Sequence, residues 1–270
     1  MRTRRMIGLL LAALIAALTA VGWVGARPAG AGQITPQATY YICSDWAILP
    51  GYAVIAITYS STCTDHKQYT IVPAQDNLQV CTNTPVPSPF AVIRITTSGS
   101  APCNGTTALW TLFTAHDGTN ACSGTPIPAG WSYTQISSSN GQCGTLLWYQ
   151  LHPSMAGQHI CSTSPYAATL VITAIGTTSL CNGLPLYTTA TAYNGIQACA
   201  VTVIPAVDVV TRADQTGQCG QYYALTLVAA YNNVVVCPFS PIPAHYYSAA
   251  SAPVTNCEGY TLGYRLAYVP

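Results

Sequence analysis

Apolar positions in this chain fall in short runs rich in β-branched residues, separated by stretches of Pro, Gly, Ser and Thr. Residues 52–58, 90–96 and 170–175 are runs of this kind, and their length and composition are typical of buried β-strands. Near the C-terminus apolar and polar residues alternate, which predicts a strand with Tyr260, Leu262, Tyr264, Leu266 and Tyr268 on one face. No segment beyond the first 31 residues shows a helical period. The pattern therefore predicts an all-β fold with antiparallel pairing.

Twelve cysteines mark a repeat along these strands. Gaps of 20 to 22 residues alternate with gaps of 18 or 19, so we expect six tandem repeats of about 38 to 41 residues with two cysteines each. The cysteines are Cys43, Cys63, Cys81, Cys103, Cys122, Cys143, Cys161, Cys181, Cys199, Cys219, Cys237 and Cys257. The predicted repeats are residues 38–80, 81–121, 122–160, 161–198, 199–236 and 237–270, within one domain of residues 32–270.

Prolines follow the first cysteine of most repeats, for example Pro85 with Pro87 and Pro241 with Pro243. Because proline lacks an N–H group and fixes φ, this stretch is expected to be an extended connector or edge segment. Counting the connector as a chain reversal gives four legs per repeat, as in a propeller blade. Both a linear array and a ring-closed, propeller-like arrangement stay open.

Two further signals concern turns. A glycine one or two places after the second cysteine predicts a β-bulge or a close backbone approach; these are Gly105, Gly144, Gly183, Gly220 and Gly259. The pairs Asp117-Gly118, Asn194-Gly195 and Asn232-Asn233 predict tight hairpin turns.

The even number of cysteines points to disulfide bonds, because no C-x2-C spacing suggests zinc. Two pairing schemes fit the spacing. Pairing within each repeat uses all twelve cysteines, whereas pairing across the link between repeats, as in 63–81, strands Cys43 and Cys257 unless a ring closes. We therefore favour pairing within repeats.

The first 31 residues resemble a secretory signal peptide, with Arg2, Arg4 and Arg5 before an apolar stretch that ends in small residues. The alternative is an uncleaved membrane anchor. Cleavage predicts a secreted, extracellular or cell-surface protein without a membrane span. Four basic residues then remain against seven acids, too few for the basic surface that nucleic-acid binding requires.

Charged residues make up only 6% of the chain, against about 25% in an ordinary domain. A Tyr- and Thr-rich surface with little like-charge repulsion suits self-association or an extracellular matrix. A soluble β protein with a neutral surface explains the same composition.

Candidate chemistry is sparse. Asp65-His66 and His116-Asp117 place acids beside imidazoles, but neighbours on a strand point to opposite faces. His152, His159 and His245 belong to no metal-ligand motif. We therefore expect no catalytic residues, no metal, no cofactor and no enzymatic activity.

Aromatic residues are the strongest lead to binding. Trp131, Tyr133, Trp148 and Tyr149 flank the cysteine-containing turn of the third repeat, and Trp110 and Tyr187 hold similar late positions. Such rings suit stacking on sugars, although recurrence at fixed offsets also suits core packing. We expect a structural or assembly role at a surface or matrix, with possible self-association. The alternative is a multivalent module for carbohydrate, protein or cell-surface partners. The segments 58–62, 97–102, 137–142, 176–180, 213–218 and 250–256 are the turns where binding is expected first.

Overall fold

A computed structural model of the chain describes residues 38–82, 84–97, 102–104 and 108–270, and Thr39–Pro270 forms one compact unit. The predicted signal peptide, residues 1–31, lies outside the described residues. The described part is built of β-strands, with one three-residue 3₁₀ helix, η1 (Gly217–Cys219). The all-β prediction is confirmed.

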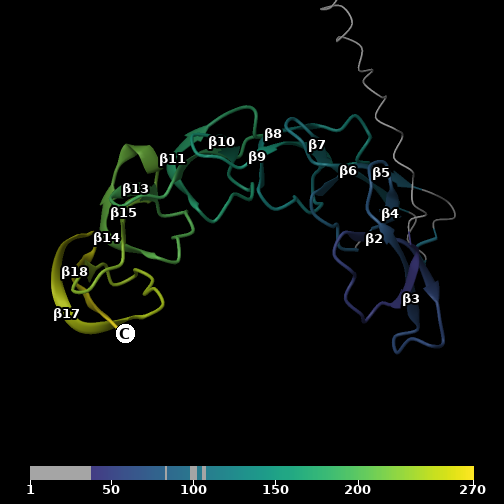
Figure 1. Cartoon of the computed structure of the whole chain (residues 1–270). Helices are drawn as coiled ribbons and strands as arrows, with labels where there is room; N and C mark the ends of the chain where they lie inside the picture. The colour runs from purple at the N-terminus through teal and green to yellow at the C-terminus, as the bar shows by residue number, and fades with distance from the viewer. Residues whose placement is uncertain (1–37, 83, 98–101, 105–107) are drawn as a thin grey trace, which may run out of the picture. The chain divides into compact units, whose positions relative to one another are not determined.

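Counted from the short strand that leads to its first cysteine, each of the six repeats contributes three strands (Figure 1). The first strands end at or next to the first cysteine and are β1 (Tyr40–Cys43), β4 (Gln79–Cys81), β7 (Asn120–Cys122), β10 (His159–Cys161), β13 (Ile196–Cys199) and β16 (Val235–Val236). The second strands are β2 (Tyr52–Tyr59), β5 (Phe90–Thr97), β8 (Trp131–Ser138), β11 (Leu170–Thr177), β14 (Asp208–Gln215) and β17 (Tyr246–Cys257). The third strands are β3 (Lys67–Pro73), β6 (Ala108–Thr114), β9 (Leu147–Pro153), β12 (Pro185–Thr191), β15 (Tyr223–Ala229) and β18 (Tyr260–Tyr268).

Within a repeat the third strand is central and pairs antiparallel with both others, as in the order β1-β3-β2. The described residues of the proline-containing connector between the first and second strands form no strand in any repeat. The connector does reverse the chain, because the first and second strands both run antiparallel to the third. Each repeat nevertheless has three strands and not the four of a propeller blade, since the connector adds no strand to the sheet. Among the described strands, no pairing joins the first repeat to the last.

The predicted turns between repeats form, but they do not close hairpins. Gly195 has a φ of 89°, as a tight turn requires, yet β12 before the turn and β13 after it belong to different sheets. β13 instead pairs with β15 of its own repeat, and the Gly195 N–H donates to the Leu227 carbonyl at 2.7 Å. The hairpin prediction is wrong here because a turn signal reverses the chain without choosing its strand partner.

The second strand of every repeat carries a β-bulge after its third residue, as at the register shift between Val54 and Ala56. The described glycines after the second cysteine instead sit in turns with positive φ, with open space around them, as at Gly144 and Gly183. The bulge was thus predicted at the wrong place. Its effect is to turn the third and sixth residues of the second strand, such as Val54 and Ile57, to the same face.

All twelve cysteines are paired within their own repeats, which confirms the favoured scheme and rules out pairing across the links. The bonded cysteines have Cα atoms 5.3 to 5.6 Å apart. Of the expected binding turns, 250–256 lies wholly within β17, and the first half of 213–218 belongs to β14. Residues 98–101 of the turn 97–102 lie outside the described residues.

All six hydrophobic clusters among the described residues span neighbouring repeats rather than filling single ones, and five of them include a disulfide. One cluster joins Val54, Ile71 and Tyr69 of the first repeat to Cys81 and Cys103 of the second. The next four clusters repeat this composition along the chain, each ending on the disulfide of the following repeat. A unit of about 40 residues cannot bury enough apolar area alone, so each repeat completes the core of its neighbour.

Candidate functional site

The contact between one repeat and the next, here called the junction, recurs five times and uses a fixed set of positions. The first component is a hydroxyl three residues after the first cysteine. Ser164, Thr202 and Ser240 each accept a hydrogen bond from a backbone N–H of the preceding repeat, at 2.7, 2.9 and 2.8 Å. The donors are the third residues of the second strands: Tyr133, Ile172 and Val210. The second strand is the outer strand of its repeat, and the opposing residues Leu151, Thr189 and Leu227 make their backbone hydrogen bonds on the side of the first strand. The hydroxyl therefore satisfies a buried N–H that has no partner within its own repeat.

The remaining repeats show where this position changes. Thr84 and Thr125 are also buried and donate to the carbonyls of Cys81 and Cys122 at 2.7 and 2.6 Å. In the first repeat the same position is Trp46, which is 64% exposed. The small hydroxyl residue is thus present wherever another repeat packs on it.

A backbone hydrogen bond forms the second component of the junction. The N–H of the sixth residue of the second strand donates to the carbonyl just before the next repeat's second cysteine. Ile57 donates to Pro102, Ile95 to Gln142 and Ile136 to Leu180, at 2.7 to 2.8 Å. In the last junction Ala213 and Cys257 form the equivalent parallel bridge, in which the Glu258 N–H donates to the Ala213 carbonyl at 3.2 Å.

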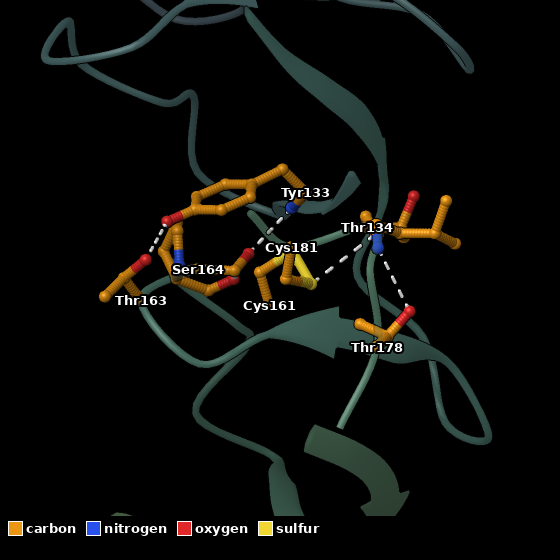
Figure 2. The surroundings of a disulfide bond; sticks show 9 residues. Tyr133, Thr134, Cys161, Thr163, Ser164, Thr178 and Cys181 are labelled. Atoms are coloured by element: carbon orange, nitrogen blue, oxygen red, sulfur yellow. Dashed lines mark hydrogen bonds between the residues drawn. A yellow bond between two sulfur atoms is a disulfide. The ribbon is translucent and has the colours of Figure 1, made fainter. Parts of the chain in front are cut away.

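The disulfide is the third component. The first cysteine of every repeat except the first is fully buried, whereas Cys43 is half-buried. Figure 2 shows Cys161–Cys181 beside Tyr133 and Thr134 of the preceding repeat, with the Cys181 Sγ 3.9 Å from the Thr134 carbonyl oxygen. Each of these five disulfides therefore closes a loop in its own repeat and packs against the repeat before it.

Of the four predicted binding aromatics, Tyr133 is only 2% exposed. Its ring stacks on Tyr149 at a centroid distance of 4.0 Å, and its hydroxyl bonds to Thr163 of the next repeat. Burial raises the pKa of Tyr133 to about 12, against the lowering effect of the Thr163 bond. Trp131 and Trp148 are half-buried and pack in different clusters. The four residues thus do not form one exposed platform, and glycan binding by the accessible ones stays a prediction.

The junctions also contain a recurring groove, here called the junction groove. Cavities of about 200, 520 and 400 Å³ lie at the first, fourth and fifth junctions. Equivalent residues line them: the sixth residue of the second strand, a residue opposite it on the third strand, and the cysteine turn of the next repeat. The opposing residues are Tyr69, Tyr187 and Leu225, and Trp110 and Tyr149 hold the same register in the other two junctions.

In the described structure no hydrogen bond joins the acid to the neighbouring imidazole in Asp65-His66 or in His116-Asp117. His152 instead contacts Asp117, with Nδ1 and Oδ1 2.7 Å apart, a pair that the sequence did not suggest because 35 residues separate them. Ser132, opposite His152 on the paired strand, is fully buried and bonds to the Ser154 hydroxyl. No hydrogen bond among the described residues joins His152 to a Ser, Thr or Cys nucleophile. The described residues contain no group of three His, Cys, Asp or Glu side chains able to hold a metal ion.

No helix in the described part of the chain is long and apolar enough to cross a membrane. The chain matches no family model, no curated protein and no solved structure. The junctions are therefore the observations from which a function can be argued.

Proposed function

We propose that this protein is a secreted, non-catalytic structural component of a cell surface or extracellular matrix. The observation that carries the proposal is the packing of five disulfides into the junctions between repeats. A covalent bond within each repeat thereby also supports the contact that joins it to its neighbour. A continuous array built in this way is suited to bearing mechanical load or acting as a spacer outside the reducing cytoplasm.

The energetics support the same role. Each disulfide closes a loop of 20 to 22 residues, worth about 3 kcal/mol of chain entropy. The apolar clusters, the junction hydroxyls and the backbone bonds add nearest-neighbour coupling, so opening one repeat also weakens the next. With 6% charged residues the surface offers little repulsion to other molecules of the same kind.

The location of the protein in its producing cells tests this proposal. We expect the chain in the medium or at the surface of intact cells, where added protease or antibody reaches it. We also expect no thiol to react with an alkylating reagent before reduction. Recovery of the protein inside intact cells with reactive thiols would contradict the proposal.

A second candidate function, multivalent binding, is favoured by the recurrence of the junction groove. Similar weak sites along one chain gain avidity when they bind together. A glycan or peptide array probed with the intact protein tests it. Tyr222 lines the groove of the fourth junction and is 40% exposed, so Tyr222→Ala is expected to weaken binding. Tyr193 is 65% exposed and does not line the groove, so Tyr193→Ala is the control. A blank array for a monomeric preparation, or equal loss in both variants, rules this candidate out.

A further inference from the structure

A cavity of about 330 Å³ lies where the second repeat meets the third, apart from the junction groove. The sixth residue of the second strand, which lines the groove, does not line this cavity. Side chains of both repeats line it, among them Ile93, Phe113, His116, Asn120, Gln142 and Trp148. Small-molecule sites in proteins are concave spaces of about 300 to 1,000 Å³ with apolar walls and a few polar groups. We call this space the second-junction cavity.

Two aromatic rings distinguish the second-junction cavity from the same place in other junctions. Trp148 is paired with the first cysteine of its repeat, and the equivalent residues of other repeats are Leu109, Leu186 and Ala224. Phe113 is on the third strand of the second repeat, and its equivalents are Val72, His152, Ala190 and Val228. Junctions thus pack without these two rings, which leaves their presence here to be explained by a ligand.

The polar groups of the cavity can both donate and accept hydrogen bonds. Asn120 and Gln142 are exposed residues, and neither side-chain amide bonds to another residue in the described part of the chain. An amide offers two N–H donors and a carbonyl acceptor, which suits a ligand rich in hydroxyl groups. The described lining contains no Lys, Arg, Asp or Glu, so an ionised ligand would lose its hydration without gaining an opposite charge.

His116 is held in one orientation beside these amides. Its backbone N–H donates to the Thr119 hydroxyl at 3.0 Å, and its ring packs edge-on against Phe113 with centroids 5.3 Å apart. Its Nδ1 lies 3.1 Å from the Thr114 carbonyl oxygen, which can only accept, so Nδ1 carries the proton. The Nε2 atom of the neutral ring is then left as an acceptor for a ligand hydroxyl.

The junction fixes the other side of the cavity. The Gln142 carbonyl accepts the Ile95 N–H at 2.8 Å, and the Gln142 N–H donates to the Ser139 carbonyl at 3.0 Å. Trp148 packs in the same hydrophobic cluster as Val92 of the second repeat. Both walls are therefore in place before a ligand arrives, which lowers the entropic cost of binding.

We propose that the second-junction cavity binds one neutral pyranose sugar unit, alone or as part of a glycan. The aromatic rings pack on the apolar face of the pyranose. The side chains of Asn120, Gln142 and His116 bond to its hydroxyl groups. The inference goes beyond the structural role proposed above, and it assigns a different site from the junction groove of the multivalent-binding candidate.

Titration with neutral methyl pyranosides tests the proposal. The probes are the methyl glycosides of glucose, galactose, mannose and N-acetylglucosamine, each added to isotope-labelled intact protein with its disulfides formed. We expect at least one probe to shift the side-chain NMR signals of Trp148, Asn120 and Gln142 along a single saturating curve.

Residues present at equivalent positions of other repeats supply the variants. Trp148→Leu reproduces Leu109 and Leu186. Gln142→Leu reproduces Leu180, which accepts the equivalent backbone bond. We expect Kd to rise about five- to tenfold in each variant, because each loses a stacking or hydrogen-bonding contact. Circular dichroism and disulfide mapping verify the folds, and Gln142→Leu, at an exposed residue, carries the test if Trp148→Leu does not fold.

Two control variants should leave Kd unchanged. Trp46→Leu makes the same exchange at a Trp that is 64% exposed in the first repeat. Tyr222→Ala alters the junction groove of the fourth junction.

Four results would overturn the proposal. These are no signal shift with any pyranoside at its highest soluble concentration, binding of adenine without binding of any pyranoside, equal weakening in Trp46→Leu and Trp148→Leu, and weakening in Tyr222→Ala alone. The last result would support the junction groove instead. Each of the four leaves the structural role standing, since that role is tested by the location of the protein and by its thiols.

Discussion

The junction hydroxyl of Ser164 offers the most direct perturbation of repeat coupling. Ser164 is 5% exposed and accepts the Tyr133 N–H at 2.7 Å (Figure 2). Ser164→Ala removes this acceptor with almost no change of shape and leaves the buried donor unsatisfied. Such a loss costs about 1 to 3 kcal/mol.

Amide hydrogen exchange of Tyr133, followed by NMR with the disulfides intact, measures this cost where it arises. A cost of about 1 to 3 kcal/mol corresponds to exchange that is roughly 5 to 150 times faster in Ser164→Ala. Ser164→Thr keeps a hydroxyl and is expected to retain most of the protection.

Ser138→Ala provides the matched control. The Ser138 hydroxyl also accepts a backbone N–H, that of Asn140, but on an exposed turn where water replaces it. We expect a change within about 0.5 kcal/mol. Equal protection of Tyr133 in wild type and Ser164→Ala, or an equal effect of Ser138→Ala, would refute the role assigned to the junction hydroxyl.

Three more outcomes follow from the burial of individual groups. The bonds Cys43–Cys63 and Cys161–Cys181 both span 20 residues, so replacing either pair with Ala loses the same loop-closure entropy, about 3 kcal/mol. Urea unfolding should nonetheless show a larger loss for Cys161→Ala/Cys181→Ala, by about 1 kcal/mol or more, because only that pair fills a junction; equal losses would contradict the packing role. Burial raises the pKa of Asp208, so the stability associated with its neutral acid is present at low pH and lost as the pH rises through the folded-state pKa. Asp208→Asn should therefore raise the thermal midpoint at pH 7 and change it little at about pH 3, below the ordinary Asp pKa of about 3.9; a gain that is larger at acid pH would contradict this. Tyr133, with a pKa raised to about 12, should give the last component of a tyrosinate absorbance titration, and Tyr133→Phe should remove it. Stability linked to Tyr133 is present below about pH 10 and falls as the pH rises towards about 12, and a latest component unchanged in Tyr133→Phe would contradict the assignment.

Local signals in the sequence were sufficient to predict the repeat, the strands and the connectors. The cysteine spacing and the prolines at positions such as Pro85 and Pro87 reflect constraints that act within a few residues. The within-repeat disulfides followed from the requirement that every cysteine find a partner. These features depend on neighbouring residues or, for the disulfides, on the number of cysteines that must be paired, and the structure confirms them.

Strand partners and the bulge could not be predicted in the same way. Asn194-Gly195 marks a turn, but whether β13 pairs backwards with β12 or forwards with β15 depends on contacts with residues 224–227, more than 20 positions further along the chain. Five of the six bulge residues are β-branched like most of the residues around them, so residue type does not distinguish the bulge; they are Ile55, Ile93, Thr134, Thr173, Thr211 and Ala249.

One signal of the junction was present in the sequence and was missed. The third position after the first cysteine is Thr84, Thr125, Ser164, Thr202 and Ser240 in five repeats, and Trp46 in the first. A small hydroxyl residue at a fixed offset, with one bulky exception, indicates a conserved contact within the array and an end where that contact is absent. For the aromatics of the third repeat, the alternative of core packing, which their fixed offsets from cysteine suggested, holds for Tyr133 and Tyr149, because both pack in the junction.

The most direct test of the account is the disulfide map of the native protein. Pepsin digestion at low pH without prior reduction, followed by mass spectrometry, prevents thiol exchange during the analysis. The account predicts peptides crosslinked through 43–63, 81–103, 122–143, 161–181, 199–219 and 237–257. A peptide crosslinked through 63–81 or 103–122, or a free thiol at any of the twelve cysteines, would contradict it.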